Sequence, residues 1–232
     1  MSLDRVPHQV DACYPADNQE VFTRLRHAAL FHDVVNLRER PVSAGGTVLQ
    51  ATGFHVEAQP LSHSVPAIGY RLVEADRRRM LPAKLATFGI TGPDVGRLQR
   101  EGRLATAGRV VRVEQVSEPR RGQRFAFIME TRLGDAAFAL AEGADMVVCE
   151  ATFADTEVAL AREYGHLTAG QAGRIAAESR ARLLVLTHFS QRSHRDDRQR
   201  LAGQAEAAFG GPVVLARDLD RIPVPPRHSA AH

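Results

Sequence analysis

The second half of the chain alternates apolar, strand-like segments with segments of helical spacing, and this pattern restricts the fold more than any other feature. The strand-like segments are residues 125–129, 145–149, 183–187 and 213–215. The helical segments are residues 136–141, 155–164, 168–179 and 197–209. Because helices that alternate with strands bury their apolar sides against a sheet, we predict a layered α/β domain.

The first part of the chain predicts one helix followed by three strands. Apolar side chains recur at helical spacing over residues 17–31, which predicts a helix with Asp17 as its N-cap. Three later segments are rich in β-branched residues and are separated by turn residues, as is typical of strands. These segments are residues 47–55, 56–61 and 68–73.

Composition limits where the protein can reside in the cell and which side chains can bind a metal. No apolar run approaches the ~20 residues that a membrane helix requires, and the first residues lack the apolar core of a signal peptide. We therefore expect a soluble, cytoplasmic protein with no membrane contact. Cys13 and Cys149 are the only cysteines and lie far apart, so we expect neither a disulfide framework nor a cysteine zinc cluster. Any metal would be held by histidine and carboxylate side chains.

Positive charge is concentrated in one segment, residues 74–124. This segment has twelve basic and six acidic residues, whereas the whole chain has a net charge of only +3. Its glycines and prolines break any long element, and it separates two predicted strands by about fifty residues. The composition fits either a solvated face or an element that binds a polyanion. We expect a protruding arm within a domain over residues 1–222, followed by a disordered tail at 223–232.

Five residues that can bind a metal or transfer a proton stand at predicted strand ends or in loops. They are His63, Glu130, Glu150, His166 and His188. One such histidine alone is more often a hydrogen-bonded structural residue than a ligand. Strand ends in α/β folds commonly hold ligands, so five residues together favour a metal site or an acid–base site.

His166 also lies two residues before a predicted helix start. Thr168 and Gln171 have the spacing of a capping box. Free backbone N–H groups at such a start attract phosphate, so we expect either a phosphate site beside His166 or a capped helix with no further role.

Several motifs of the chain, taken together, resemble one known family. They are Ser62-His63-Ser64-Val65-Pro66-Ala67-Ile68-Gly69-Tyr70-Arg71, Gly92-Pro93-Asp94-Val95-Gly96-Arg97-Leu98, Glu150-Ala151-Thr152-Phe153, Glu163-Tyr164-Gly165-His166-Leu167-Thr168-Ala169-Gly170-Gln171-Ala172 and Leu186-Thr187-His188-Phe189-Ser190-Gln191-Arg192. In this order they resemble ribonuclease Z, the tRNA 3′-processing endonuclease family of the metallo-β-lactamase superfamily. The resemblance covers most of the chain.

The resemblance implies a metallo-β-lactamase-like αββα sandwich, incomplete at the N-terminus, and a hydrolase that uses two zinc ions in the family. By position, His63 and His188 correspond to zinc ligands, and Glu130 stands where the family has an aspartate that bridges both metals. Glu150 and His166 match a dyad that protonates the leaving 3′ oxygen.

The resemblance also assigns the basic segment and the partners. Residues 74–124 match the arm with which the family clamps tRNA, so precursor tRNA is the implied substrate and a homodimer the implied assembly. The arm residues expected to contact RNA are Arg77, Arg78, Arg79, Lys84, Arg97, Arg100 and Arg103.

The chain departs from the family pattern in its metal ligands. The motif His-x-His-x-Asp-His is absent from the 232 residues, which begin just after the point where it is expected. Glu130 is longer than aspartate by one methylene, a displacement of ~1.5 Å. Cys149 and Ser193 replace a histidine and a tyrosine. We therefore expect at most one weakly held zinc ion and no detectable cleavage of precursor tRNA by this chain alone.

Three functions remain open from the sequence. The first is a zinc-dependent endoribonuclease for precursor tRNA. The second is a truncated or degenerate, non-catalytic homologue that binds RNA or a partner. The third is a metallo-hydrolase of small phosphodiesters or sulfate esters, which would not need the arm. Zinc content separates the first from the second, and tRNA binding separates the second from the third.

Overall fold

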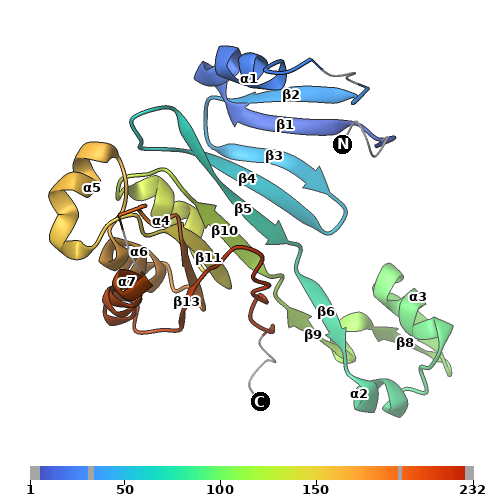
Figure 1. The fold of residues 1–232 in the computed structure, drawn as a ribbon. Helices are drawn as coiled ribbons and strands as arrows, with labels where there is room; N and C mark the ends of the chain where they lie inside the picture. The colour runs from blue at the N-terminus through green and yellow to red at the C-terminus, as the bar shows by residue number, and fades with distance from the viewer. Residues whose placement is uncertain (1–5, 31–33, 193–194, 228–232) are drawn as a thin grey trace. The chain divides into compact units, whose positions relative to one another are not determined.

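The computed structural model describes residues 6–30, 34–192 and 195–227 (Figure 1). The chain divides into two compact units. The first, which we call the body, comprises Met1–Val73 and Gln123–Pro225. The second, which we call the arm, comprises Glu74–Gly122 together with Pro226–His232.

The body is built on a seven-stranded sheet of order β13-β12-β11-β10-β5-β4-β3. Strands β10 to β13 run parallel to their neighbours, whereas β5 pairs antiparallel with β10 and β3 pairs antiparallel with β4. Because β10, β11 and β12 are parallel, their C-terminal ends lie along one edge of the sheet. The strands are β3 (Gly46–Ala51), β4 (Phe54–Leu61), β5 (Ala67–Glu74), β10 (Arg124–Ile128), β11 (Met146–Glu150), β12 (Leu184–Thr187) and β13 (Val213–Leu215).

Helices pack against this sheet and complete the predicted α/β layers. Helix α4 (Asp135–Ala141) contacts β4 and β10, and α6 (Ala169–Glu178) contacts β11 and β12. Helix α7 (Arg195–Phe209) packs on α6 and β13, while α5 (Val158–Tyr164) follows the short turn η3 (Asp155–Glu157). The core of the body is almost fully buried and includes Ile128, Leu140, Leu167, Ile175 and Leu186.

The N-terminal helix is shorter than predicted. Helix α1 spans Gln19–Arg26 after a 3-10 turn, Ala16–Asn18, so Asp17 is not its N-cap. The helix ends because the chain tightens after Arg26, where the Ala28 N–H bonds to the carbonyl of Leu25. The rest of the predicted helix up to residue 30 is a turn and bends, and residue 31 lies outside the described residues.

The sequence did not predict the two strands that flank this helix. Strand β1 (Val10–Pro15) pairs in parallel with β2 (Leu37–Val42) as a separate two-stranded sheet. Asp11 on β1 binds Arg38 and Arg40 on β2 through its carboxylate. These two arginines hold the pKa of the Asp11 carboxyl below its usual value, the Arg38 hydrogen bond being the largest cause.

The arm has its own short elements and its own core. Strand β6 (Arg77–Met80) pairs with β9 (Ser117–Arg120), and β7 (Arg103–Thr106) pairs with β8 (Arg109–Arg112). Helices α2 (Pro82–Thr87) and α3 (Pro93–Glu101) and the turn η2 (Val113–Gln115) complete the unit. The glycines and prolines keep each element short, as predicted. The buried side chains are Leu85, Ile90, Leu98, Leu104, Val111, Val113 and Val116.

The structure bears on two expectations drawn from composition, the absence of a membrane-spanning helix and the disordered C-terminal tail. Among the described residues, no helix has the length and apolar content needed to cross a membrane. The predicted tail lies partly outside the described residues, and residues 223–227 form neither helix nor strand.

Candidate metal centre

Two of the five candidate residues adopt a left-handed backbone within two residues of the C-terminal end of a strand. Glu130 follows β10 with a φ of 56°, and His188 follows β12 with a φ of 57°. For a residue other than glycine such a conformation costs about 1–3 kcal/mol, so it persists only where surrounding structure enforces it. Backbone outliers of this kind cluster at functional sites, and both stand at the same edge of the sheet.

The Glu130 carboxylate lies between two histidines. Its Oε2 is 3.1 Å from His63 Nε2, and its Oε1 is 2.7 Å from His188 Nε2. The Nε2 atom of His166 is 3.9 Å from the same Oε2. The side chain of His63 is nearly buried, at 8% exposure, whereas that of Glu130 is 39% exposed. The convergence of His63, Glu130 and His188 expected from the sequence is present, with the longer side chain of Glu130 reaching both rings.

The His63 ring is fixed from behind by the end of helix α5. Its Nδ1 lies 2.8 Å from the carbonyl oxygen of Gly165, so Nδ1–H donates to that carbonyl and leaves Nε2 facing Glu130. Arg132 holds the same segment by donating from Nε to the Arg162 carbonyl at 3.0 Å and from Nη2 to the Glu163 carbonyl at 3.5 Å. These contacts close the C-terminus of α5, whose last carbonyls have no partner within the helix.

The His166 ring is fixed by Glu150, as the sequence predicted for this pair. The distance from His166 Nδ1 to Glu150 Oε2 is 2.8 Å. The Glu150 side chain is fully buried, whereas that of His166 is 15% exposed, so only His166 of this pair reaches the surface. The Thr131 N–H also donates to this carboxylate at 2.8 Å and the Leu167 N–H at 3.3 Å, which compensates for its burial.

The His188 ring is fixed by a residue that the sequence did not lead us to expect. Thr152 Oγ1 lies 2.9 Å from His188 Nδ1 and 2.6 Å from Glu150 Oε2. A hydroxyl has one proton to donate and two lone pairs, so it donates to Glu150 and accepts from His188. Thr152 lies within the Glu150-Ala151-Thr152-Phe153 motif. Its position two residues after a candidate acid could have indicated its role from the sequence.

All three histidines therefore share one arrangement. Each Nδ1 binds a fixed acceptor, and each Nε2 faces the Glu130 carboxylate. Metal-binding histidines are oriented in this way, with the outer nitrogen donating to a protein acceptor. The ligand atoms of His63, Glu130 and His166 lie within 4.8 Å of one another. Nitrogen and carboxylate donors at this spacing fit a zinc ion.

A second group of possible ligands, Glu150, His166 and His188, lies within the same spacing. It fits a metal less well, because the Glu150 carboxylate already accepts hydrogen bonds from Thr131, Thr152 and His166. The Nε2 side of the three histidines is thus the better metal site.

Comparison with known proteins identifies the family. No family model matches the chain. Ribonuclease Z of Nocardia farcinica is 54% identical to it over 228 residues, which are 98% of this chain and 74% of that relative. The chain belongs to the ribonuclease Z family.

Solved structures show the fold of this ribonuclease Z family member. The short form of human tRNase Z matches with a TM-score of 0.59 and 19% identity, over 97% of this chain and 71% of that one. The metallo-β-lactamase fold protein YhfI from Bacillus subtilis matches with a TM-score of 0.56 and 17% identity, over 90% of this chain and 63% of that one. The chain therefore has the metallo-β-lactamase fold, as predicted.

The start of helix α6 is a capped helix, and the phosphate site considered for it is not supported. The capping box of Thr168 and Gln171 is present. The Ala169 N–H donates to the Phe153 carbonyl at 3.0 Å, and the Gly170 N–H donates to the Asp155 carboxylate at 2.8 Å. Because these groups are already paired and a carboxylate occupies the terminus, a phosphate would find its donors taken there.

Of the two residues that depart from the family pattern, Cys149 and Ser193, the structure describes only Cys149. Cys149 is fully buried, and burial raises the pKa of its thiol well above the usual value, so it stays protonated and is no metal ligand. Ser193 lies outside the described residues.

The arm residues proposed to contact RNA fall into two groups. Three are already engaged: Arg78 donates to Ser117, Arg79 pairs with Glu118 and Arg97 pairs with Glu101. The other four have no ion pair or side-chain hydrogen bond among the described residues. They are Arg77, Lys84, Arg100 and Arg103.

Two of these free cations face another arginine across a strand pair. Arg77 stands opposite Arg120, and Arg103 stands opposite Arg112. Like charges placed directly opposite one another destabilise a sheet, so folding alone does not explain them. A bound polyanion would compensate for this repulsion.

Proposed function

We propose that this protein acts as a zinc-dependent endoribonuclease in the 3′ processing of precursor tRNA in the cytoplasm, and that these 232 residues alone bind this RNA without detectable cleavage. The observation that carries the proposal is the 54% identity with a ribonuclease Z over 98% of the chain. The convergence of three histidine Nε2 atoms on Glu130 supports it. The non-catalytic homologue and the hydrolase of small phosphodiesters or sulfate esters are not favoured by this identity.

His63 and His188, which lie 3.1 and 2.7 Å from the two Glu130 oxygens, would hold the metal together with Glu130. His166 Nε2, at 3.9 Å from the carboxylate, would be left for proton transfer. When bound, zinc supplies Lewis-acid polarisation of the phosphodiester and lowers the pKa of water. The chain supplies the orientation, because Gly165 fixes the ring of His63 and Thr152 fixes that of His188. The partly exposed Glu130 carboxylate keeps the two rings on a common side.

Glu150 and His166 would form the acid–base pair. The buried Glu150 carboxylate accepts the Nδ1–H of His166 and holds the ring so that Nε2 points away from it. A water oxygen would bond to phosphorus as the bond from phosphorus to the 3′ oxygen breaks, and His166 Nε2 would give its proton to that leaving 3′ oxygen. Glu150 acts through His166 and is a positioning residue in this scheme.

The arm would bind the RNA by its charge. Its four cations without an ion pair, together with Arg112 and Arg120 that face two of them, supply the positive surface, and its own core gives this surface a fixed shape. We further propose that two copies of the chain form a homodimer, which sedimentation analysis of the purified chain would reveal as a species of twice the mass of the chain.

Binding of RNA tests the proposed function. We expect the 232-residue chain to bind precursor tRNA more tightly than an unstructured RNA of equal length, with affinity that falls steeply as salt rises. Equal affinity for both RNAs would overturn the proposal.

Zinc content gives a separate prediction. A stable tetrahedral site takes three protein ligands and one water, and the cluster provides few ligands beyond that number. We expect at most one weakly held zinc per chain, lost in the Glu130→Ala variant, and no detectable cleavage by this chain alone. Elemental analysis that finds two tightly held zinc ions, or turnover that a chelator stops, would show this prediction to be wrong.

A further inference from the structure

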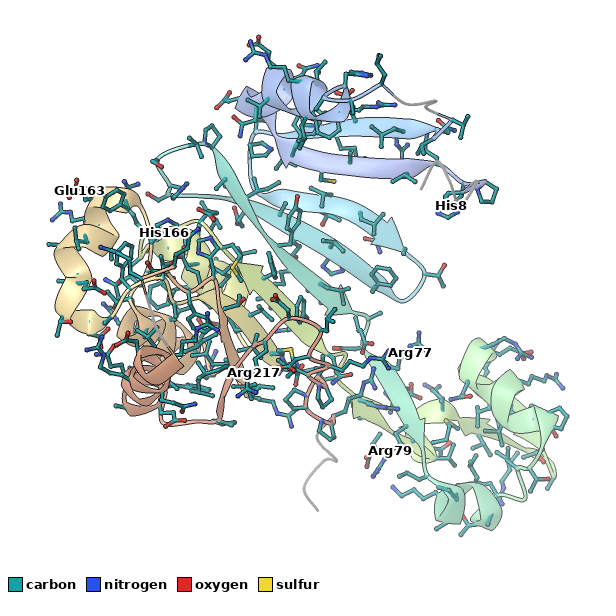
Figure 2. All side chains as sticks on the ribbon, in the orientation of Figure 1. His8, Arg77, Arg79, Glu163, His166 and Arg217 are labelled. Atoms are coloured by element: carbon teal, nitrogen blue, oxygen red, sulfur yellow. The ribbon has the colours of Figure 1, made fainter. Side chains whose placement is uncertain are left out.

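An exposed aromatic ring stands beside the acid–base pair with no role in the chemistry described so far. Tyr164 ends helix α5 and is 55% exposed. It lies between Glu163 and Gly165 in the chain, and Figure 2 labels its neighbour Glu163 and, two residues further on, His166. Folding does not require a large apolar ring at such an exposed position, since the core of the body is complete without it.

A second aromatic ring connects Tyr164 to the site. The rings of Tyr164 and Phe153 stack with their centroids 6.3 Å apart and an interplanar angle of 19°. Phe153 is only 4% exposed, and its ring centroid lies 6.1 Å from that of His166. Tyr164 is therefore held in a defined orientation on a rigid support that also contacts the proposed proton donor.

A cation completes this exposed surface. The guanidinium of Arg192 lies 5.5 Å from the centroid of the Phe153 ring. Its side chain is 62% exposed, and its ion pair with Glu157 is long, at 4.0 Å. A salt bridge of this length on the surface contributes little, so Arg192 is available to another anion.

We propose that Tyr164 is a stacking platform for an unpaired nucleobase next to the cleaved phosphodiester, and that Arg192 contacts the adjoining phosphate. An exposed ring with a neighbouring arginine is the combination by which proteins bind single-stranded RNA, since every base offers a π-face and every linkage a negative charge. The inference rests on the proposed function, because it takes the unpaired 3′ end of precursor tRNA as the ligand.

A fluorescent base tests this inference without any cleavage. A set of precursor tRNAs is prepared, each with a single 2-aminopurine at one of the nucleotides that flank the cleavage point. Binding of each RNA is followed with EDTA present. Stacking on an aromatic ring quenches its emission. We expect quenching by the unaltered chain and by Tyr164→Phe at one position, and its loss in Tyr164→Ala and Tyr164→Leu.

The variants separate stacking from other effects. Tyr164→Phe keeps the ring and removes the hydroxyl, whereas Tyr164→Leu keeps apolar bulk and removes the ring. Phe127, another exposed aromatic at 40% exposure, gives a matched control, and Phe127→Ala should leave the quenching unchanged. Affinity for a short single-stranded RNA should fall about 5- to 100-fold in Tyr164→Ala. Arg192→Gln should weaken binding of the same RNA and make it less salt-dependent.

The outcomes distinguish this inference from the proposed function. Quenching of equal size in Tyr164→Ala and the unaltered chain overturns the inference and leaves the proposed function standing. Binding of precursor tRNA without quenching at any position has the same meaning. If the unaltered chain does not bind precursor tRNA, the proposed function fails and the inference fails with it.

Discussion

At the scale of single residues, the proposed metal centre would depend on groups that are not themselves metal ligands. Gly165 and Thr152 bind the Nδ1 atoms of His63 and His188, and Arg132 binds the carbonyl of Arg162 at the end of the helix that precedes Gly165. A change at these positions should therefore alter metal binding while the ligands themselves remain in place.

Thr152 gives the first test of this view. Thr152→Val keeps the shape of the side chain but removes the hydroxyl that orients His188. We expect zinc affinity to fall about 10- to 100-fold, because losing a group that orients a metal ligand has effects of this size. Thr152→Ser, which keeps the hydroxyl, should restore the affinity. Competition with a chromophoric chelator measures the effect, and equal affinities for Val and Thr would contradict the assigned role.

Gly165 gives the second test. Its φ of +82° disfavours other residues, and a Cβ at this position would lie 2.7 Å from His63 Nδ1. We expect Gly165→Ala to lower stability and to weaken zinc binding by displacing the His63 ring. Gly210 has a φ of +68°, and an added Cβ there would meet nothing within 4 Å, so Gly210→Ala carries the conformational cost alone.

Gly210→Ala should therefore cost about 1–2 kcal/mol of unfolding free energy and leave zinc affinity unchanged. Chemical denaturation and zinc titration of the two variants measure the comparison. Equal zinc affinities in the two variants would show that the contact with His63 does not position its ring.

At the scale of elements, helix packing in the body depends on a glycine inside α6. A Cβ at Gly173 would lie 2.5 Å from the backbone oxygen of Ala205 on α7. We expect Gly173→Ala to destabilise the body by about 1–3 kcal/mol, since the two backbones must separate. Gly203, on α7, has no atom within 4 Å of an added Cβ, so Gly203→Ala should stabilise by about 0.5–1 kcal/mol. Thermal unfolding followed by circular dichroism measures the change in stability of each variant. Changes in stability of the same sign in Gly173→Ala and Gly203→Ala would contradict this account.

The sequence predicted elements well where apolar periodicity reflected burial. It failed in the N-terminal part for two different reasons. Strand β2 carries Arg38, Glu39 and Arg40 in succession, so it has no apolar alternation, and its pairing depends on ion pairs with β1. In α1 the periodic residues do not mark a core, because Val21 and Leu25 remain 59% and 75% exposed.

The candidate site was predictable as a set of residues but not as a geometry. Five residues, His63 and Glu130 and His188 among them, stood out as ligand types at strand ends or in loops, and the resemblance to ribonuclease Z assigned these three to the metal. Their orientation depends on left-handed φ values at Glu130 and His188, which the sequence does not signal, since glycine or asparagine would be the expected residues there. The burial of Glu150 was likewise hidden, because an acid after a strand is usually exposed.

At the scale of the whole molecule, charge is divided between the two units. The arginines of the arm that lack a partner should bind phosphate, whereas those already paired should not. We expect Arg77→Gln combined with Arg103→Gln to weaken binding of precursor tRNA and to lower the slope of log affinity against log salt by about 1 to 2. It should also stabilise the arm slightly, because each change removes a facing pair of like charges.

The paired arginines supply the control for this prediction. Arg79→Gln combined with Arg97→Gln removes the same charge from residues bound to Glu118 and Glu101. Filter binding over a range of salt concentrations measures both variants. If the control pair lowers the salt slope as much as Arg77 and Arg103 do, the distinction between free and paired cations is wrong.

The separate core of the arm has a consequence for how this molecule can vary. Leu85, Leu98 and Leu104 are buried within the arm and contribute nothing to the core of the body. Regions with their own apolar core tend to open as independent cooperative units. If the arm binds RNA as proposed, inherited changes that weaken or strengthen that binding can accumulate in residues 74–122 without disturbing the residues that orient Glu130. Selection can adjust the range of RNAs that the protein accepts while its chemistry stays constant.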